Sequence, residues 1–371
     1  MIKKVSILIS VLVVVSMMLT AVAVAQGPVL DAGNAYFSNG TKNIKAADLF
    51  ANLNDGDTSN DPYIISLCKP DDFALGHIPG AVNISVKKLF TPDVLATLPK
   101  DQEIVVYCYT GQTSSQAVAG LNMLGYNAKS MLFGFPAWAM IEEYSIKPFN
   151  PDGNRNDFRV STEPAEAMAS YDLPTPLGDT VADAALAYFS NGTKNTTAEA
   201  LFENLNDGDT SNDPVVVDVR KKEDYDKAHV PGALYISAKE AATVDALKMI
   251  DPGKQVVVYC YTGQTGSQVT ALLNMLGYDA YNMKFGFASW SPQGKYAFNA
   301  YTSSPNYRFE GTGTAMEVGA APAAETTAAP APAAQPAELP TTGGIPADFT
   351  WLYILMGSGL VGTGALIRRR K

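Results

Sequence analysis

The sequence of 371 residues predicts an α/β fold with two tandem domains, each a mainly parallel sheet with helices on both faces. The first observation is an internal repeat. Residues 36–138 recur at 188–290 without a gap, and more than half of the aligned positions are identical. The second is that each copy alternates short continuous apolar runs with stretches of helical spacing. Such runs are typical of buried parallel strands, and their alternation with helices predicts a sheet covered on both faces.

The same elements follow one another in both copies. A helix is expected at 46–53, where apolar residues recur at helical spacing. Two buried strands are expected in each copy, at 63–67 and 103–107 in the first and at 215–219 and 255–259 in the second. The later strand of each copy runs into the sequence Cys-Tyr-Thr-Gly-Gln-Thr and then into a helix ending at Gly125 or Gly277. Ligand sites collect at the carboxyl ends of parallel strands, so a site is expected at this edge.

The repeat and the local composition predict the domain boundaries. The first domain is expected at 26–146 and the second at 181–305, and a linker rich in Pro, Asn and Asp joins them at 147–180. A stalk is expected at 306–338, because a composition dominated by Ala and Pro cannot bury a core.

The composition excludes several classes of function. A formal net charge of −10 argues against a nucleic-acid partner, which needs clustered Lys and Arg. Three cysteines do not form a disulfide framework, and the absence of a Cys-x-x-Cys pair argues against a zinc site. Acidic loops at 55–61 and 207–213 are interpreted as solvated turns, with a weak calcium site as the alternative. No metal or other cofactor is expected.

Both ends of the sequence indicate export. Residues 1–25 have the charged start, apolar run and small-residue cleavage site of a signal peptide, with an uncleaved membrane anchor as the alternative. Residues 339–371 contain Leu-Pro-Thr-Thr-Gly, an apolar segment at 349–367 and a basic tail. This order resembles the sorting signal of sortase-anchored surface proteins, which implies cleavage between Thr342 and Gly343 and attachment to the cell wall. A permanent transmembrane helix is the alternative, and both place the two domains outside the cytoplasm.

A cysteine follows the later strand in each copy, at Cys108 and Cys260. The N–H groups of the loop and the positive end of the next helix can stabilise an anionic sulfur, which favours the nucleophilic thiolate. Gly111 and Gly263 allow the loop to curl around that sulfur, and a buried structural cysteine is the alternative. These glycines and the other residues of each loop are expected to bind the substrate. The others are Tyr109, Thr110, Gln112 and Thr113 in the first copy and Tyr261, Thr262, Gln264 and Thr265 in the second.

These motifs resemble the rhodanese (thiosulfate sulfurtransferase-like) family. The resemblance rests on Asp218-Val219-Arg220, on His229-Val230-Pro231-Gly232-Ala233, on the two cysteine loops, and on the closing motifs at 133–138 and 285–290. It implies sulfur transfer from a small donor such as thiosulfate through a cysteine persulfide, without a cofactor. It also implies that Asp218 and Arg220 help to build the edge of the sheet that faces the loop.

Two other functions are weighed against sulfur transfer. Phosphatases and arsenate reductases with a similar fold carry the motif Cys-x5-Arg, whose arginine binds the oxyanion. Ser114 and Gly266 occupy the arginine positions in this sequence, which argues against phosphatase or arsenate reductase chemistry. A non-catalytic sulfur carrier or binding module is the remaining alternative, although both copies keep their cysteine.

The two copies differ beside the cysteine loop. The first copy has Ser66 and Cys68 where the second has Asp218 and Arg220, so Cys260 is expected to be the more reliable site. Cys68 and Cys108 both follow parallel strands, and Cys68 is therefore a candidate redox partner that would trap an oxidised Cys108 as a disulfide. The alternative is that Cys68 is a small apolar replacement for arginine.

Overall fold

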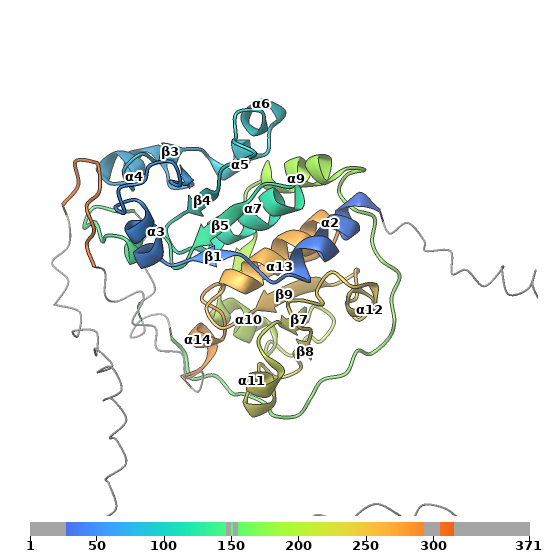
Figure 1. Cartoon of the computed structure of the whole chain (residues 1–371). Coiled ribbons are helices and arrows are strands. Elements are labelled where there is room, and N and C mark those ends of the chain that lie inside the picture. The colour runs from blue at the N-terminus through green and yellow to red at the C-terminus, as the bar shows by residue number, and fades with distance from the viewer. Residues whose placement is uncertain (1–26, 146–149, 151–154, 293–304, 315–371) are drawn as a thin grey trace, which may run out of the picture. The chain divides into compact units, whose positions relative to one another are not determined.

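The computed structural model describes residues 27–145, 150, 155–292 and 305–314 (Figure 1). Within them the two copies form two separate five-stranded sheets that are parallel throughout, as the sequence predicts. The predicted signal peptide, most of the stalk, and the sorting signal with its apolar segment lie outside the described residues. None of the helices in the described ranges has the length and apolar character needed to cross a membrane.

The two sheets have the same strand order, β1-β5-β4-β2-β3 in the first copy and β6-β10-β9-β7-β8 in the second. The first comprises β1 (Asn43–Ile44), β2 (Tyr63–Ser66), β3 (Val82–Asn83), β4 (Ile104–Tyr107) and β5 (Ala128–Met131). The second comprises β6 (Asn195–Thr196), β7 (Val215–Asp218), β8 (Leu234–Tyr235), β9 (Gln255–Tyr259) and β10 (Asp279–Met283). The four strands predicted from the sequence agree with β2, β4, β7 and β9 to within a residue.

Helices fill the connections between the strands. The first copy has α2 (Pro28–Phe37), α3 (Ala46–Asn52), α4 (Pro70–Leu75), α5 (Val86–Leu89), α6 (Pro92–Leu95), α7 (Gln112–Met123) and the 3-10 turn η1 (Phe135–Ala137). The second has α9 (Val181–Phe189), α10 (Ala198–Asn204), α11 (Lys222–Lys227), α12 (Val244–Leu247), α13 (Gln264–Met275) and α14 (Phe287–Trp290). The helix predicted at 46–53 is confirmed as α3.

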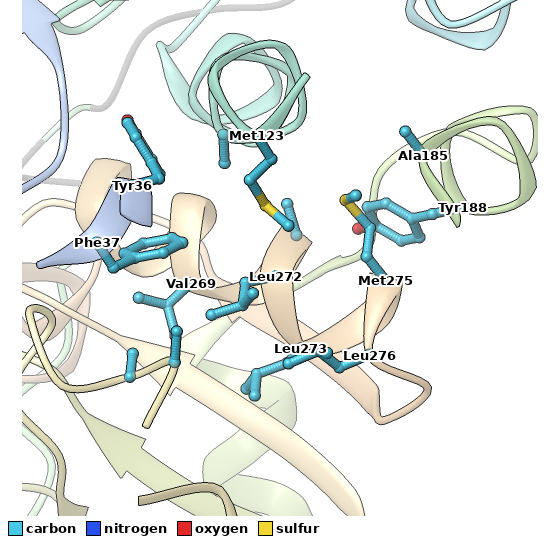
Figure 2. Close-up of a cluster of buried hydrophobic side chains, with 14 of the residues drawn as sticks. Tyr36, Phe37, Met123, Ala185, Tyr188, Val269, Leu272, Leu273, Met275 and Leu276 are labelled. Atoms are coloured by element: carbon cyan, nitrogen blue, oxygen red, sulfur yellow. The ribbon is translucent and has the colours of Figure 1, made fainter. Parts of the chain in front are cut away.

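One hydrophobic cluster is shared by the two copies, and each copy also has a buried cluster of its own. Helix α7 packs on β4 and β5, α13 packs on β9 and β10, and the two helices lie against each other between the sheets (Figure 1). Figure 2 shows Tyr36 and Phe37 of the first copy in the same cluster as Val269 and Leu272 of the second. Separate sheets therefore do not mean independent cores, because the helical faces of both copies are buried against each other.

Glycines permit the close approach of the helices. A Cβ atom on Gly120 would lie 2.8 Å from the ring of Phe90 and 2.9 Å from that of Phe189, a helix residue of the other copy. The two rings stack with centroids 4.2 Å apart. A side chain at Gly120 would separate them, so this position requires glycine for packing.

The segment that follows each copy packs on the other copy. Residues 155–165 follow the first copy, and Ser161 pairs with His229 of the second through backbone hydrogen bonds of 2.9 Å. Residues 305–314 follow the second copy, and Glu310 pairs in the same way with His77 of the first. The sequence predicts that 306–314 belong to the stalk. In the structure the ring of Tyr307 stacks on that of Phe50 with the centroids 4.0 Å apart, so this part of the segment packs on the first copy.

Candidate functional site

The two cysteines lie at the edge where the sequence predicts a site. Cys108 directly follows β4 and Cys260 directly follows β9, and each is 3% exposed. The loops reach Gly111 and Gly263 with φ values of 80° and 89°, in the left-handed region that favours glycine. Helices α7 and α13 begin at the next residue. Each cysteine therefore stands beside the first N–H groups and the positive end of a twelve-residue helix.

The closing motif holds the peptide of each cysteine in place. The N–H groups of Phe135 and Phe287 donate hydrogen bonds of 2.8 Å to the carbonyl oxygens of the two cysteines. A Cβ atom on Gly134 would lie 2.3 Å from the first of these oxygens, and one on Gly286 would lie 2.4 Å from the second. These glycines are functional positions that the sequence analysis quoted only as part of a motif, and the close approach of two backbones explains them.

The residue before each of these glycines differs from the pattern of the family that the sequence resembles. Phe133 and Phe285 stand where that family commonly has glycine. Their φ values of 67° and 63° lie in the left-handed region, which a bulky side chain rarely adopts. The turn thus keeps the backbone conformation of glycine while it carries a phenylalanine.

Backbone amides surround the sulfur of Cys260. The N–H of Gly263 lies 3.2 Å from Sγ. Burial raises the pKa of the Cys260 thiol above its ordinary value, and hydrogen bonds from the N–H groups of Gly266, Thr262, Gly263 and Thr265 oppose that rise. The sequence predicts a lowered thiol pKa at this position, and that prediction is wrong because complete burial outweighs the amides.

The sulfur of Cys108 has different neighbours. The N–H and the hydroxyl of Ser114 lie 3.5 and 3.6 Å from Sγ, and the hydroxyl also lies 2.9 Å from that of Ser130. Ser114 occupies the position that arginine holds in Cys-x5-Arg phosphatases, and it is fully buried. The sequence analysis used this serine only to argue against phosphatase chemistry.

A buried ion pair supports the loop-facing edge of the second sheet. Arg220 donates to the carboxylate of Asp218 at 2.7 Å and to the carbonyl of Ala228 at 2.6 Å. Its guanidinium also lies 4.0 Å from the ring centroid of Phe287, in the closing motif. Arg220 therefore joins β7 to the motif that holds Cys260.

The first copy has a thiol where this arginine stands. Cys68 is 3% exposed, and its N–H donates to the hydroxyl of Ser66 at 3.3 Å. Burial raises the pKa of the Cys68 thiol, and the negative charge of a nearby Cys108 thiolate raises it further. Both thiols are free in the structure, and the redox link between them stays a prediction.

The tyrosines of the two cysteine loops are held by acidic residues of helices α4 and α11. Tyr109 donates to the carboxylate of Asp72 and accepts from the N–H of Lys69 at 2.8 Å. Burial would raise the pKa of Asp72, but hydrogen bonds from Ser145 and Tyr109 hold it below its usual value. In the second copy Tyr261 donates to Asp224 at 2.7 Å. Both tyrosines therefore brace the loop.

Several of the predicted loop residues contact the other copy. The hydroxyls of Thr113 and Thr193 lie 3.2 Å apart, and those of Thr41 and Thr265 lie 3.4 Å apart. The side chains of Gln112 and Gln264 likewise reach groups of the opposite copy. The sequence predicts that these residues bind substrate, and the structure places their side chains in contact with the other copy.

Neither loop contains Lys or Arg, so an anionic ligand would be held by backbone N–H groups and the helix end. In the parts of the chain that the structure describes, no group of three acidic, histidine or cysteine side chains could hold a metal ion. The acidic loop at 55–61 turns inward on itself, since Asp55 and Asp57 accept hydrogen bonds from the N–H groups of Asp57 and Ser59 at 2.7 and 3.0 Å.

The sequence is similar to known sulfurtransferases over the length of one copy. It is 32% identical over 82 residues to a sulfurtransferase of Allochromatium vinosum, a match that covers 22% of this chain and 75% of the relative. It is 33% identical over 79 residues to the thiosulfate sulfurtransferase GlpE of Coxiella burnetii, which covers 21% of this chain and 72% of that protein. A match of 31% identity to a tRNA sulfurtransferase of Thermoplasma acidophilum covers 21% of this chain and only 15% of that enzyme.

Solved structures give further similarities. A rhodanese-like domain protein of Staphylococcus aureus is 26% identical with a TM-score of 0.25, and the match covers 29% of this chain and 99% of that one. A thiosulfate sulfurtransferase of Pseudomonas aeruginosa is 14% identical with a TM-score of 0.26, over 76% of this chain and 48% of that one. The family model of the rhodanese-like domain matches residues 45–141 and 197–293, which together make up more than half of the chain. The chain therefore belongs to the rhodanese-like family and carries two copies of its domain.

Proposed function

We propose that this protein is an exported, surface-anchored sulfurtransferase that moves sulfane sulfur from a donor such as thiosulfate to a thiophilic acceptor. The observation that carries the proposal is the placement of Cys108 and Cys260. Each follows a buried strand, lies at the end of a helix, and receives hydrogen bonds at Sγ from its own loop or helix. The sulfurtransferases among its relatives support the same reaction class.

The reaction proceeds in two displacements at sulfur. The thiolate attacks the outer sulfur of thiosulfate, a new S–S bond forms, and sulfite leaves with the electron pair of the old one. The cysteine persulfide then holds the sulfur until an acceptor such as cyanide or a thiolate attacks its outer atom. That second step releases the cysteine as thiolate, so the enzyme returns to its starting state without an external oxidant or reductant.

The protein supplies the electrostatic part of this chemistry. Backbone N–H groups aimed at the sulfur stabilise negative charge there without moving during the reaction. Burial disfavours the thiolate form of Cys260. The loop amides therefore contribute mainly by stabilising the negative charge on the sulfur once the thiolate has formed. Because neither loop contains Lys or Arg, the negative charge of a sulfur donor would be stabilised by backbone amides and the helix end. Thiosulfate, mercaptopyruvate-like compounds and polysulfide are all donors that could be bound in this way.

Thiosulfate-dependent formation of thiocyanate from cyanide tests the proposal on the full chain. We expect turnover by the parent, partial loss in Cys108→Ser and in Cys260→Ser, and complete loss in the double variant. Parent protein without turnover, which also fails to hold sulfane sulfur after incubation with thiosulfate or polysulfide, would leave the non-catalytic binding module as the function. A protein that loads sulfur but transfers none to cyanide would be a sulfur carrier.

The location is a separate part of the proposal, supported by the order of the pentapeptide, apolar segment and basic tail. Mass spectrometry of the native protein should find a C-terminal peptide that ends at Thr342 and is linked to peptidoglycan. Recovery of the intact chain through Lys371 from detergent-extracted membranes would instead establish a membrane anchor.

A further inference from the structure

We propose that the hydroxyl of Ser114 is a hydrogen-bond donor to the reacting sulfur of Cys108, which makes Ser114 a catalytic residue of the first copy only. The inference deepens the proposed function and rests on it. Its starting point is that Ser114 is completely buried, and that both its N–H and its hydroxyl lie within hydrogen-bonding distance of Sγ, at 3.5 and 3.6 Å.

A chain of serines fixes the direction of the Ser114 hydroxyl. Ser115 donates to the hydroxyl of Ser130 at 3.0 Å, and the hydroxyls of Ser130 and Ser114 lie 2.9 Å apart. The Ser130 hydroxyl lies closer to Ser114, at 2.9 Å, than to the carbonyl oxygen of Gly111, at 3.4 Å. When Ser130 donates to Ser114, the one proton of Ser114 is left to point at Sγ. Ser130 and Ser114 then each accept one hydrogen bond and donate one, and such chains polarise in the direction of the final acceptor. All three serines are fully buried, so water does not compete for these bonds.

The second copy lacks this chain at every link. Gly266 replaces Ser114, and Asn282 replaces Ser130. A Cβ atom on Gly266 would lie 3.0 Å from Oδ1 of Asn282, so the asparagine and a serine compete for the same space. Ser267, the counterpart of Ser115, has no hydrogen-bond partner for its buried hydroxyl among the described residues. The serine chain is thus a property of the Cys108 site and not a consequence of the shared fold.

The position of the hydroxyl selects the step that it assists. Ser114 contacts the inner sulfur, which carries the negative charge when the cysteine is a thiolate. In the persulfide that charge moves to the outer sulfur. Ser114 therefore stabilises the thiolate that leaves when the acceptor takes the outer sulfur, and a better-stabilised thiolate leaves faster. Removing the hydroxyl takes this hydrogen bond from the free thiolate as well as from the leaving one.

The pH profile of alkylation tests this assignment without any sulfur donor. In full-length protein carrying Cys260→Ser, the rate at which iodoacetamide labels Cys108, read by peptide mass spectrometry, is compared with and without Ser114→Ala. Loss of one hydrogen bond to a thiolate should move the midpoint of the profile to higher pH by about one unit. Ser130→Ala, which removes only the next link, should move it the same way by less. Ser267→Ala in a Cys108→Ser background is the matched control and should leave the profile of Cys260 unchanged.

Pre-formed persulfide then isolates the second step. With cyanide as acceptor, Ser114→Ala should slow release of the outer sulfur by about tenfold, the change that corresponds to one pH unit of thiolate stability. Profiles of Ser114→Ala and Ser130→Ala that superimpose on the parent would overturn the assignment. A displaced alkylation profile in a protein that never loads sulfur would instead overturn the proposed function alone, so the two failures are distinguishable.

Discussion

The side-chain amide of Gln264 donates a hydrogen bond of 3.2 Å to the carbonyl oxygen of Thr110, so the cysteine loop of the second copy contacts the cysteine loop of the first. The relationship is reciprocal. Gln112 of the first loop accepts from the side chain of Asn282 at 2.8 Å and from the N–H of Phe285 at 3.3 Å. Both glutamines are nearly completely buried. Each cysteine loop is therefore shaped in part by the copy to which it does not belong.

This contact predicts an effect of one copy on the chemistry of the other. In a Cys260→Ser background, Gln264→Ala should lower kcat/KM of Cys108 by about fivefold, which corresponds to one typical hydrogen bond. Gln102→Ala removes an exposed glutamine of the first copy and serves as the control. Steady-state thiosulfate–cyanide kinetics give the comparison, and an unchanged kcat/KM in Gln264→Ala would contradict the prediction.

The second prediction concerns pH. Burial raises the pKa of Cys260, and only the deprotonated sulfur is the nucleophile, so the rate must rise with pH up to that raised pKa. In Cys108→Ser, single-turnover sulfur loading should increase about tenfold per pH unit through neutral pH, without a plateau below about pH 9. A rate through Cys260 that is level between pH 7 and 9 would show that the thiol is already ionised at neutral pH, and would contradict the prediction.

The same reasoning makes the ranking of the two sites depend on pH. The intact pair of Asp218 and Arg220 favours Cys260, as the sequence predicts, whereas the raised pKa of Cys260 disfavours that site near neutrality. We expect Cys260→Ser to lose more activity than Cys108→Ser in alkaline buffer, and this difference to shrink or reverse near pH 7. Activities of the two variants in a constant ratio over the whole range would contradict this expectation.

The third prediction concerns stability. Arg220→Ala should lower the free energy of unfolding by about 3–5 kcal/mol, because it leaves the carboxylate of Asp218 buried without its charge partner. Urea unfolding followed by circular dichroism measures the change. Lys222→Ala breaks an exposed ion pair with Asp226 and should have no resolvable effect. Equal stability of the two variants would mean that the buried pair contributes no more than a surface pair.

The fourth prediction concerns oxidation of the first copy. Cys68 and Cys108 follow the neighbouring strands β2 and β4, whose last residues Ser66 and Tyr107 pair in the sheet, so both thiols lie at the same edge. Mild peroxide oxidises Cys108 to a sulfenic acid, and the thiol of Cys68 should then attack that sulfur to form a disulfide, with loss of water. Non-reducing peptide mapping should find the Cys68–Cys108 linkage, and Cys68→Ser should yield sulfinic acid at Cys108 instead. Sulfinic acid at Cys108 beside a free Cys68 in the parent protein would end this idea.

Much of the fold and both cysteines could be predicted from the sequence. Buried parallel strands leave continuous apolar runs, and the repeat presented each run twice, so β2, β4, β7 and β9 were found to within a residue. The cysteine loops were found because a strand, a Cys-containing turn and a helix follow one another within a few residues. These are local patterns, and local patterns are what a sequence displays directly.

The relations between the copies could not be predicted in this way. Gln112 and Gln264 were assigned to substrate binding because polar loop residues beside a cysteine have that role in a single domain. Their partners lie more than a hundred residues away in the sequence, and no periodicity marks such a contact. The raised pKa of Cys260 was missed for a related reason, since burial depends on what the whole chain places around the sulfur.

The exchanged segments have a consequence for how the chain folds. The edge of the first copy at His77 is completed by Glu310, which the ribosome adds only after the entire second copy. Contacts between residues so distant in sequence form slowly, because a long loop must close before they contribute. The edge of the first copy therefore stays incomplete until the end of the second copy has been synthesised, and in this respect the two halves are finished together.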